Sequence, residues 1–381
     1  MLPEGWESTT LGEIMDFRNG LNFSQSDSKN LIKVVGVSDF SLGNVLSRTD
    51  SLKETYVDQF KDDDLLQEND FLFVRSNGNK SLIGRCLYFP HIPEPISFSG
   101  FTIRGRLKNP LISATYIFQI VAGEYFRKYI NLSGSGTNIS NLSQEILSNT
   151  PLILPPLPEQ KKIAAILSTW DRAIDGAEKL LANSQQQKKA LMQQLLTGKK
   201  RLPGFTGEWE TKYLGDIADI QTGSSNRQDS LTNGEYTFFD RSEDIRTSNR
   251  YLFDCEAVIV PGEGQDFVPK YFVGKFDLHQ RTYAISCFQA CDGKFIFYTV
   301  GYHRSHFLSQ AVGSTVKSLR LPMFQKMPLK LPPLSEQRAI AAVLTTADEE
   351  ITAIESDLLR LRQEKKALMQ QLLTGKRRVR V

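Results

Sequence analysis

The segment from Leu154 to Gly198 occurs twice in this chain, and that repeat constrains the fold more than any other feature. Leu-Pro-Pro-Leu-Pro-Glu-Gln begins at Leu154 and returns as Leu-Pro-Pro-Leu-Ser-Glu-Gln at Leu331. The Lys-Lys-Ala-Leu-Met-Gln-Gln-Leu-Leu-Thr-Gly-Lys block that begins at Lys188 returns unchanged at Lys365. Both spacings are 177 residues, so nothing is inserted or lost between the two copies.

Each copy predicts one long helix. The paired prolines give an extended entry, because the residue before a proline avoids the helical region. Gly198 and Gly375, with basic residues beside them, fit the helix ends. Between these points the apolar residues follow a heptad, which predicts a narrow seam as in a two-stranded coiled coil. The seam positions are Ile163, Leu167, Trp170, Ile174, Ala177, Leu181, Leu191 and Leu195 in the first copy, and Ile340, Leu344, Ala347, Ile351, Ile354, Leu358, Leu361, Leu368 and Leu372 in the second.

Such a seam requires a partner, and two interpretations are open. In one, each helix packs on its own globular domain. In the other, which the equal lengths and matching heptads favour, the two copies pack antiparallel on each other. Four polar residues interrupt the seam, and they either fix its register or mark where another protein joins. They are Ser184, Gln187, Lys188 and Lys365.

Two unlike regions alternate with the helices. Both open in the same way, with Trp6-Glu7 and Trp209-Glu210, but their middles share almost nothing. Short strand patterns between polar glycine loops predict that both regions are mixed, β-rich domains. We therefore expect an α+β fold with a pseudo-two-fold, circular repeat, in which Val381 lies near Met1. The expected parts are a globular domain over 1–153, a helical spacer over 154–200, a second globular domain over 201–330 and a second spacer over 331–381.

Composition excludes several classes. The formal charge of +3 does not by itself argue for nucleic acid. No apolar run approaches the ~20 residues of a membrane span, and the start of the chain has no signal-peptide pattern. The four cysteines show no disulfide framework, which predicts a cytoplasmic location.

No catalytic motif is present in the sequence. There is no Asn/Asp-Pro-Pro-aromatic motif for base methylation and no glycine-rich dinucleotide motif. We therefore expect a binding protein that is not an enzyme and has no metal or cofactor of its own. One group has spacings loosely like a zinc finger, but it lies in a strand–turn–helix stretch among aromatic residues, which favours a structural role. That group is Cys287, Cys291, His303 and His306.

The polar loops suit nucleic acid. Arg, Lys, Asn, Gln and Ser side chains at strand ends can reach base edges and phosphates, and glycine loops offer backbone N–H groups to phosphate. Polar surface loops are common, so composition alone does not settle the ligand. The candidates are Arg75, Ser76, Asn77, Asn79, Lys80, Arg104 and Thr137 in the first domain, and Gln265, Gln280, Arg281, Ser314 and Lys317 in the second.

The repeated Leu-Pro-Pro-Leu-x-Glu-Gln, the shared helix ends and the paired Trp-Glu openings resemble the specificity subunit of type I restriction–modification enzymes. The resemblance covers essentially the whole chain. It implies two target-recognition domains, each reading one half of a split, asymmetric site in double-stranded DNA. It also implies that the two helices form an antiparallel spacer in a chain that is not itself catalytic.

The same resemblance implies partner subunits. Two modification (methyltransferase) subunits would dock on the helices, and restriction (translocase/nuclease) subunits would join them. S-adenosylmethionine, ATP and Mg are then expected in those partners. The residues expected to contact partners are Gln160, Gln187, Gln337 and Lys365.

Two other functions remain open from the residues alone. One is a coiled-coil scaffold whose end domains bind protein or carbohydrate, and the other is an enzyme with an unrecognised motif. Target-dependent retardation of duplex DNA would separate a DNA-binding specificity subunit from such a scaffold. Activity of the purified chain with S-adenosylmethionine and DNA would be required by the enzyme.

Overall fold

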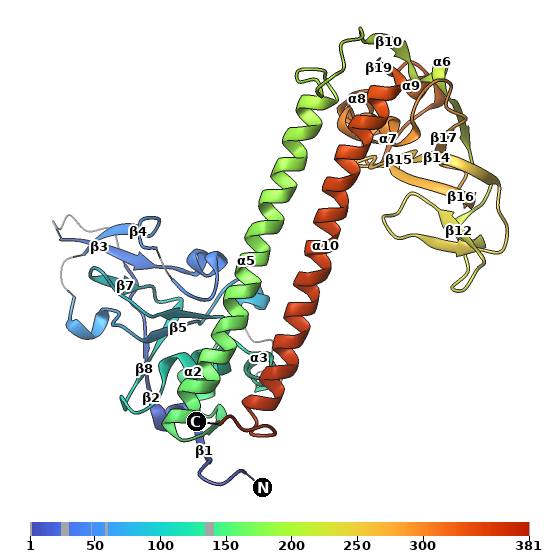
Figure 1. Ribbon diagram of the computed structural model, residues 1–381. Coiled ribbons are helices and arrows are strands. Elements are labelled where there is room, and N and C mark those ends of the chain that lie inside the picture. Colours follow the sequence, from blue (N-terminus) through green and yellow to red (C-terminus); the bar gives the residue numbers. More distant parts are fainter. Residues whose placement is uncertain (1, 24–29, 47, 58–59, 134–140, 381) are drawn as a thin grey trace. The chain divides into compact units, whose positions relative to one another are not determined.

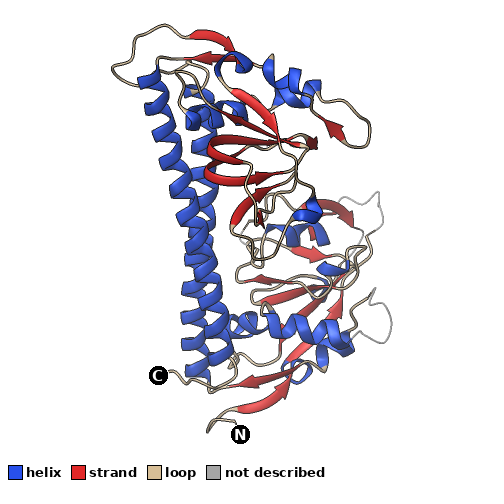
Figure 2. Ribbon diagram, turned by 90° about the vertical axis from the view of Figure 1, so that its right-hand side faces the viewer, coloured by secondary structure: helices blue, strands red, loops and turns tan. Residues whose placement is uncertain are grey.

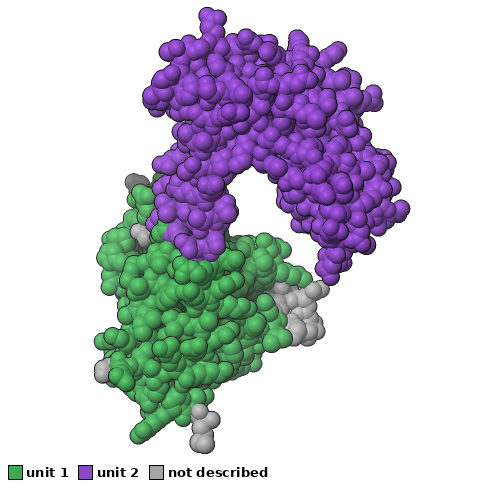
Figure 3. Space-filling model, turned by 45° about the vertical axis from the view of Figure 1, so that its right-hand side comes forward, with its two compact units in different colours: residues 1–176, 359–381 green, residues 177–358 purple. Residues whose placement is uncertain are grey.

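A computed structural model describes residues 2–23, 30–46, 48–57, 60–133 and 141–380. The chain forms two compact units, coloured in Figure 3. Unit 1 contains residues 1–176 and 359–381, and unit 2 contains residues 177–358. The boundaries fall inside the two long helices, so each unit contains one globular domain and part of both helices.

The two predicted helices are confirmed. They are α5 (Leu157–Leu195) and α10 (Leu334–Leu372), each of 39 residues, and both begin directly after a proline pair (Figure 1). At ~1.5 Å per residue each is roughly 60 Å long. In Figure 2 the strands lie in the globular regions and none interrupts these helices. Within the described residues, no helix has the length and apolar character needed to cross a bilayer.

The helices pair antiparallel within each unit. In unit 1, Asp171 in the first half of α5 forms an ion pair with Lys365 near the end of α10. In unit 2, Lys188 late in α5 forms an ion pair with Asp348 early in α10. Every predicted seam position is buried or half-buried, so the predicted seam is confirmed. The helix ends also pack on the domains, because Ile163 lies in the hydrophobic core of unit 1.

The globular part of unit 1 is built on small sheets. A four-stranded antiparallel sheet has the order β2 (Met15–Asn19), β8 (Thr102–Leu107), β5 (Asp70–Val74), β6 (Cys86–Phe89). A three-stranded sheet has the order β4 (Lys53–Val57), β3 (Asn30–Val35), β7 (Ile96–Phe98), and β1 (Glu7–Thr10) pairs with β9 (Pro151–Leu154). The helices are α1 (Leu11–Ile14), α2 (Ala114–Val121), α3 (Glu124–Ser133) and α4 (Gln144–Ser148), with 3-10 turns η1 (Val37–Leu42), η2 (Asp62–Asp64) and η3 (Lys80–Leu82).

The globular part of unit 2 contains one six-stranded sheet in place of the four-stranded and three-stranded sheets of unit 1. Its order is β11 (Asp219–Thr222), β17 (Thr282–Ser286), β14 (Phe253–Pro261), β16 (Lys270–Leu278), β12 (Tyr236–Phe239), β13 (Arg246–Ser248). Two short pairs accompany it, β10 (Glu210–Tyr213) with β19 (Pro328–Leu331), and β15 (Glu263–Gly264) with β18 (Lys317–Ser318). The helices are α6 (Leu214–Ile217), α7 (Gly293–Tyr302), α8 (Ser305–Gln310) and α9 (Leu321–Gln325), with one 3-10 turn η4 (Arg227–Asp229).

The central strands are buried on both faces, as their apolar sequences predict. In β5, Phe71 and Phe73 face the core shared with the helices, whereas Leu72 and Val74 face a second core. In β14, Val258 and Val260 likewise lie in one core, and the alternate residues lie in another. This two-residue alternation fixes the face of the sheet on which each side chain lies, including the side chains at the end of each strand.

The circular relation expected from the sequence is also visible within the units. Gly198 and Gly375 both adopt the left-handed conformation, at φ +71° and +72°, that ends a helix. A Cβ placed on Gly198 would lie 3.5 Å from Trp209, and one on Gly375 would lie 3.3 Å from Trp6. The segment after α10 therefore lies on the opening tryptophan of the first domain, as the segment after α5 lies on that of the second.

Candidate nucleic-acid interface

Three separate segments meet where β14 ends. The Gly262 amide donates to the Arg281 carbonyl at 2.8 Å, and the Gly262 carbonyl accepts from the Leu319 amide at 2.8 Å. Arg281 lies in a tight turn between β16 and β17, closed by the Thr282 amide donating to the His279 carbonyl at 3.0 Å. We call this arrangement the strand-end junction of unit 2.

Unit 1 contains the same junction. The Arg75 amide donates to the Phe101 carbonyl at 2.8 Å, and the Arg75 carbonyl accepts from the Leu142 amide at 2.7 Å. The turn is closed by the Thr102 amide donating to the Ser99 carbonyl at 2.9 Å. Arg75 thus occupies the position of Gly262, and Phe101 occupies the position of Arg281. The backbone is shared, and the side chains it presents are different.

The junction of unit 2 gathers most of the predicted residues of that domain. Gln280 and Arg281 are exposed on the turn, and Lys317 pairs with Gly264 across β15 and β18, next to the exposed Gln265. Ser314 is exposed in the loop that enters β18. Four of the five predicted residues are therefore close to one strand end.

Two residues of this junction were not predicted. Arg281 forms an ion pair with Glu263, and Arg241 reaches the other carboxylate oxygen of Glu263 at 2.6 Å. The sequence does show Glu263 between two glycines in a polar loop, but an acidic residue is not an obvious ligand for DNA. Arg241 lies after β12, far from the other segments in the sequence.

The predicted residues of unit 1 have mixed positions. Arg75 and Ser76 are half-buried at the junction, where the Arg75 Nη1 donates to the Gly100 carbonyl at 3.5 Å. Asn77 and Asn79 use their side-chain oxygens to accept backbone N–H groups, and so shape the loop before the exposed Lys80. Phe101, which was not predicted, is 59% exposed.

Arg104 lies in the interior and is not available to a ligand. It is 5% exposed and its Nη1 donates to the Asp63 carbonyl at 2.7 Å. Burial lowers the pKa of its guanidinium. The sequence predicts it as a binding residue because it ends a strand pattern with alternating faces, but its face is covered by the segment around Asp63. Thr137, the remaining candidate, lies outside the described residues.

The two glutamines expected to contact partners are structural residues in each unit. Gln160 donates to the Pro155 carbonyl and accepts from the Ser113 amide, at 2.8 and 2.9 Å. Gln337 donates to the Pro332 carbonyl and accepts from the Asp292 amide, at 2.8 and 3.0 Å. Both are buried, and each ties the start of a long helix to the cap of α2 or α7. They cannot form part of an outer surface.

Of the four polar residues that interrupt the seam, three contact the facing helix and one is exposed. Lys188 and Lys365 pair with aspartates of the facing helix, and the buried Ser184 donates to Glu350 at 3.1 Å. These contacts support a role in register. Gln187 is exposed on α5, where it remains available to a partner.

The zinc-like group does not form a site. In the described part of the chain, no cluster of three or more His, Cys, Asp or Glu residues could hold a metal ion. His306 lies 3.0 Å from the Met323 carbonyl, and burial lowers the pKa of His303. His303 and His306 pack edge-on against Tyr302 and Phe307.

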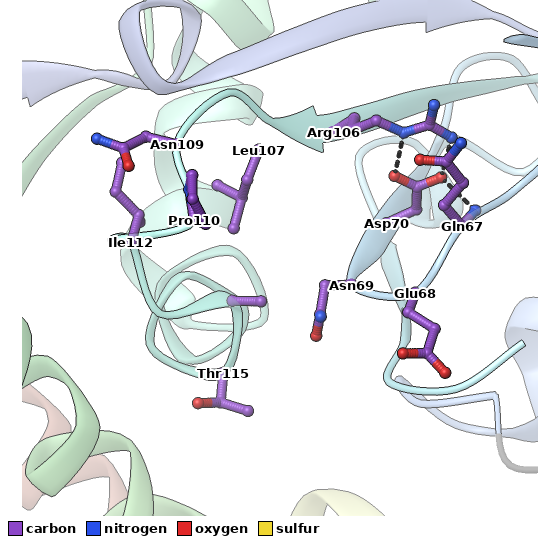
Figure 4. Close-up of a pocket in the computed structure, with 11 residues that line it drawn as sticks. Gln67, Glu68, Asn69, Asp70, Arg106, Leu107, Asn109, Pro110, Ile112 and Thr115 are labelled. Carbon is purple, nitrogen blue, oxygen red and sulfur yellow. Dashed lines mark hydrogen bonds and ion pairs between the residues drawn. The ribbon is translucent and has the colours of Figure 1, made fainter.

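A cavity of about 450 Å³ lies in unit 1 at the other end of β5 from Arg75 (Figure 4). Its main charged groups satisfy each other, because the Asp70 carboxylate accepts from Arg106 Nε at 2.8 Å and from Arg106 Nη2 at 2.7 Å. Because the cavity lies at the opposite end of β5, it is separate from the strand-end junction. It is lined by Gln67, Glu68, Asn69, Asp70, Arg106, Leu107, Asn109, Pro110, Ile112, Ala114 and Thr115.

The fold has two domains with a shared backbone junction and different side chains, each joined to an antiparallel helix pair, which is the arrangement of a binding protein with two related but distinct domains. The model of the type I restriction modification DNA specificity domain matches residues 3–183 and 206–361. The chain therefore belongs to the family of type I restriction–modification specificity subunits, which are not themselves catalytic.

Known proteins agree with this assignment. The type I restriction enzyme MjaVIII specificity subunit of Methanocaldococcus jannaschii is 23% identical, over 99% of this chain and 94% of that protein. The fold is similar to the solved S subunit of the type I restriction–modification system from M. genitalium, with 13% identity, a TM-score of 0.66, and coverage of 98% of this chain and 96% of that one. It is also similar to a chain from a structure that concerns complex assembly and conformational transition of the type I R-M system, with 18% identity, a TM-score of 0.59, and coverage of 99% and 100%.

Proposed function

We propose that this chain reads a split, asymmetric target in double-stranded DNA, with one half read by each unit. One observation carries the proposal: both units present side chains from the same strand-end junction, but with different residues at matching positions. Arg75 stands where unit 2 has Gly262, and Phe101 stands where it has Arg281. A common frame with exchanged contact residues is what two readers of different sequences require.

The chemistry of the junctions suits the edges of bases. Arginine and glutamine side chains donate to, and accept from, the groups that bases expose in the major groove. Lys317, which pairs with Gly264 next to Glu263, carries a positive charge that suits phosphate. Direct contacts to bases would then come from the turn, and positioning contacts would come from the basic residues around it.

We also propose that the helices carry the other subunits of a type I complex. Each unit has an equivalent antiparallel helix pair, so the chain offers two similar docking surfaces and suits two modification subunits. Catalysis would belong to those subunits and to restriction subunits, which would bind S-adenosylmethionine, ATP and Mg. Such a complex would work on DNA in the cytoplasm.

Exchange of one domain tests the proposal. Residues 1–150 are replaced by the corresponding region of a relative, and adenine methylation is mapped with the modification subunits present. We expect one half of the methylated motif to change and the other half to stay. A change in both halves, or in neither, would contradict separate reading. Retardation of duplex DNA that does not depend on the target would count against DNA specificity itself.

A further inference from the structure

Glu263 lies in the middle of the unit 2 junction, where a carboxylate should be unfavourable for a protein that binds DNA. Its side chain is only 12% exposed, and both of its oxygens are occupied. One accepts from Arg281 Nη1 and the other from Arg241 Nη1 at 2.6 Å. The two arginine side chains are themselves 58% and 50% exposed. Glu263 is therefore more buried than the two guanidinium groups that it holds at the surface.

Arg281 is fixed at both its backbone and its side chain. Its amide donates to His279 Nδ1 at 3.0 Å and its carbonyl accepts from Gly262. Glu263 holds only Nη1 of the guanidinium. Among the described residues, the edge formed by Nε and Nη2 donates to no other group, which leaves two parallel N–H groups for a ligand on a side chain that is 58% exposed.

We propose that Arg281 reads a guanine through this edge and that Glu263 is its positioning residue. This rests on the proposed function, and it names the base that unit 2 recognises at one position. In the major groove guanine presents two neighbouring acceptors, O6 and N7, which match two parallel N–H donors of an arginine. A guanidinium already held in one orientation loses less freedom when it binds.

Stability does not account for Glu263. Burying most of the Glu263 carboxylate carries a desolvation cost, and ion pairs to half-exposed arginines offset little of it. A carboxylate near DNA also repels phosphates and lowers affinity for every sequence. The presence of Glu263 is explained by its role in discriminating between bases, because it holds Arg281 in one orientation. Unit 1 supports this reading, because the equivalent positions hold Ser76 and Phe101. The Arg281–Glu263 pair is thus specific to unit 2 and is not part of the backbone arrangement that both units share.

The test uses the full chain assembled with its modification subunits. Four variants are compared with the parent: Arg281→Ala, Arg281→Lys, Glu263→Gln and the double variant Glu263→Gln/Arg281→Ala. Glu210→Gln is the matched control, because Glu210 pairs with Lys212 on β10, elsewhere in unit 2. Three quantities are measured: the methylated motif, affinity for target duplexes with each base at each position, and affinity for non-target duplex.

We expect Arg281→Ala to reduce preference for one guanine by roughly 5- to 150-fold, the range of a bidentate base contact. Arg281→Lys keeps the ion pair and the charge, and should lose the same preference. Glu263→Gln should lose much of that preference while its affinity for non-target duplex rises, because a negative charge is removed. The double variant should be no worse than Arg281→Ala, and Glu210→Gln should match the parent.

Each other result has a distinct meaning. An unchanged guanine requirement in both Arg281 variants would overturn the assignment of Arg281. Loss of that requirement in the Arg281 variants, with full retention in Glu263→Gln, would overturn the role of Glu263. A uniform fall in affinity for all duplexes with Arg281→Ala would identify a phosphate contact and also overturn it. A parent complex that does not distinguish target from non-target DNA would instead overturn the proposed function.

Discussion

Arg201 donates from Nε and Nη2 to the two carboxylate oxygens of Glu336, each at 2.5 Å. Glu336 is fully buried at the start of α10, and Arg201 comes just after the end of α5. The equivalent pair in unit 1, Arg378 with Glu159, joins the residues after α10 to the start of α5. Both glutamates belong to the repeated Leu-Pro-Pro-Leu-x-Glu-Gln. The motif therefore recurs because it anchors each helix start to the end of the other helix.

The first prediction concerns this anchor. Arg201→Ala leaves the buried Glu336 carboxylate without its ion-pair partner, and such a loss is strongly destabilising. We expect the melting temperature of the chain to fall, and Arg378→Ala to have the same effect through unit 1. Lys200→Ala, at an exposed neighbouring position, is the control. Equal melting temperatures for Arg201→Ala and Lys200→Ala would show that the anchor does not stabilise the fold.

The helices were predictable from sequence because their signals are local. The proline pair marks the start of each helix, the glycine marks its end and the heptad marks the seam between them, each through neighbouring residues. The exact repeat shows which of these features matter. The strand-end junction was not predictable in this way. It joins Gly262 to Arg281 and Arg75 to Phe101 through strand pairing, and these pairs have different separations along the chain. Arg104 shows the same limit, since only the tertiary fold covers its face of β8.

A second prediction concerns the polar contacts that interrupt the seam. Asp348 accepts from Lys188 of α5, and also from the Tyr298 hydroxyl of α7 at 2.7 Å. Asp171 plays the same part in unit 1, with Lys365 and with Gln119 Nε2 at 2.8 Å. Each aspartate thus joins both long helices to a helix of its domain. Burial, together with Asp348, raises the pKa of Tyr298, which keeps its hydroxyl a donor.

We expect Asp348→Ala to destabilise the chain, because it removes the acceptor of Lys188 and leaves the Tyr298 hydroxyl with a longer bond to Thr345 Oγ1, at 3.3 Å. The double variant Lys188→Met/Asp348→Leu should recover much of the loss, since the pair is partly buried, at 24% and 36% exposed, and apolar replacement of a buried ion pair is often neutral. Thermal unfolding followed by circular dichroism measures both. A double variant that is less stable than Asp348→Ala would argue that the polar contact itself is required for packing.

A third prediction concerns pH. Burial lowers the pKa of His279, whose Nδ1 accepts from the Arg281 amide; Asp240 and Glu263 oppose the shift, and Arg241 and Arg281 reinforce it. As the pH falls below the unfolded pKa of about 6.5, the unfolded chain binds a proton that the folded chain does not. The free energy of unfolding should therefore decrease below about pH 6.5.

The matched variant is His279→Asn, whose side-chain oxygen can accept the same N–H group but does not titrate. The difference in melting temperature between parent and variant should change between pH 7.5 and 5.5, with the parent losing more. Comparing the two removes the contributions of other groups. Parallel pH profiles would show that His279 does not contribute.

A fourth prediction concerns unit 1. Phe101 occupies the position of Arg281 and is 59% exposed, so it offers an apolar surface where unit 2 offers hydrogen bonds. In the major groove such a surface suits the thymine methyl group. We expect Phe101→Ala to relax one position of one half-site, at a cost of about 1–3 kcal/mol, and to leave the other half unchanged. Methylation mapping decides this, and a change in the half-site assigned to unit 2 would contradict it.

The last prediction concerns the circular relation. Val379 packs on the core of unit 1, and Gly375 lies against Pro3 and Trp6, so the segments at the two chain ends lie together in that unit. Gly204 is exposed, has φ +87° and has no neighbour near its Cα that would contact a Cβ. Exposed turns of this kind tolerate new termini. We expect a permutant in which a short linker joins Val381 to Met1, and the chain opens at Gly204, to assemble with the modification subunits and to methylate the parental motif.

A second opening provides the control. Cutting at Val258, inside the buried strand β14, should prevent folding of unit 2 even though the linker is the same. The measurements are the melting temperature, co-purification with the modification subunits and the methylated motif. Failure of the Gly204 permutant to assemble, with a linker that leaves the uncut chain fully active, would show that the join after α5 must stay covalent. Success would show that contacts such as Arg201 with Glu336, and not chain continuity, hold each domain on its helix pair.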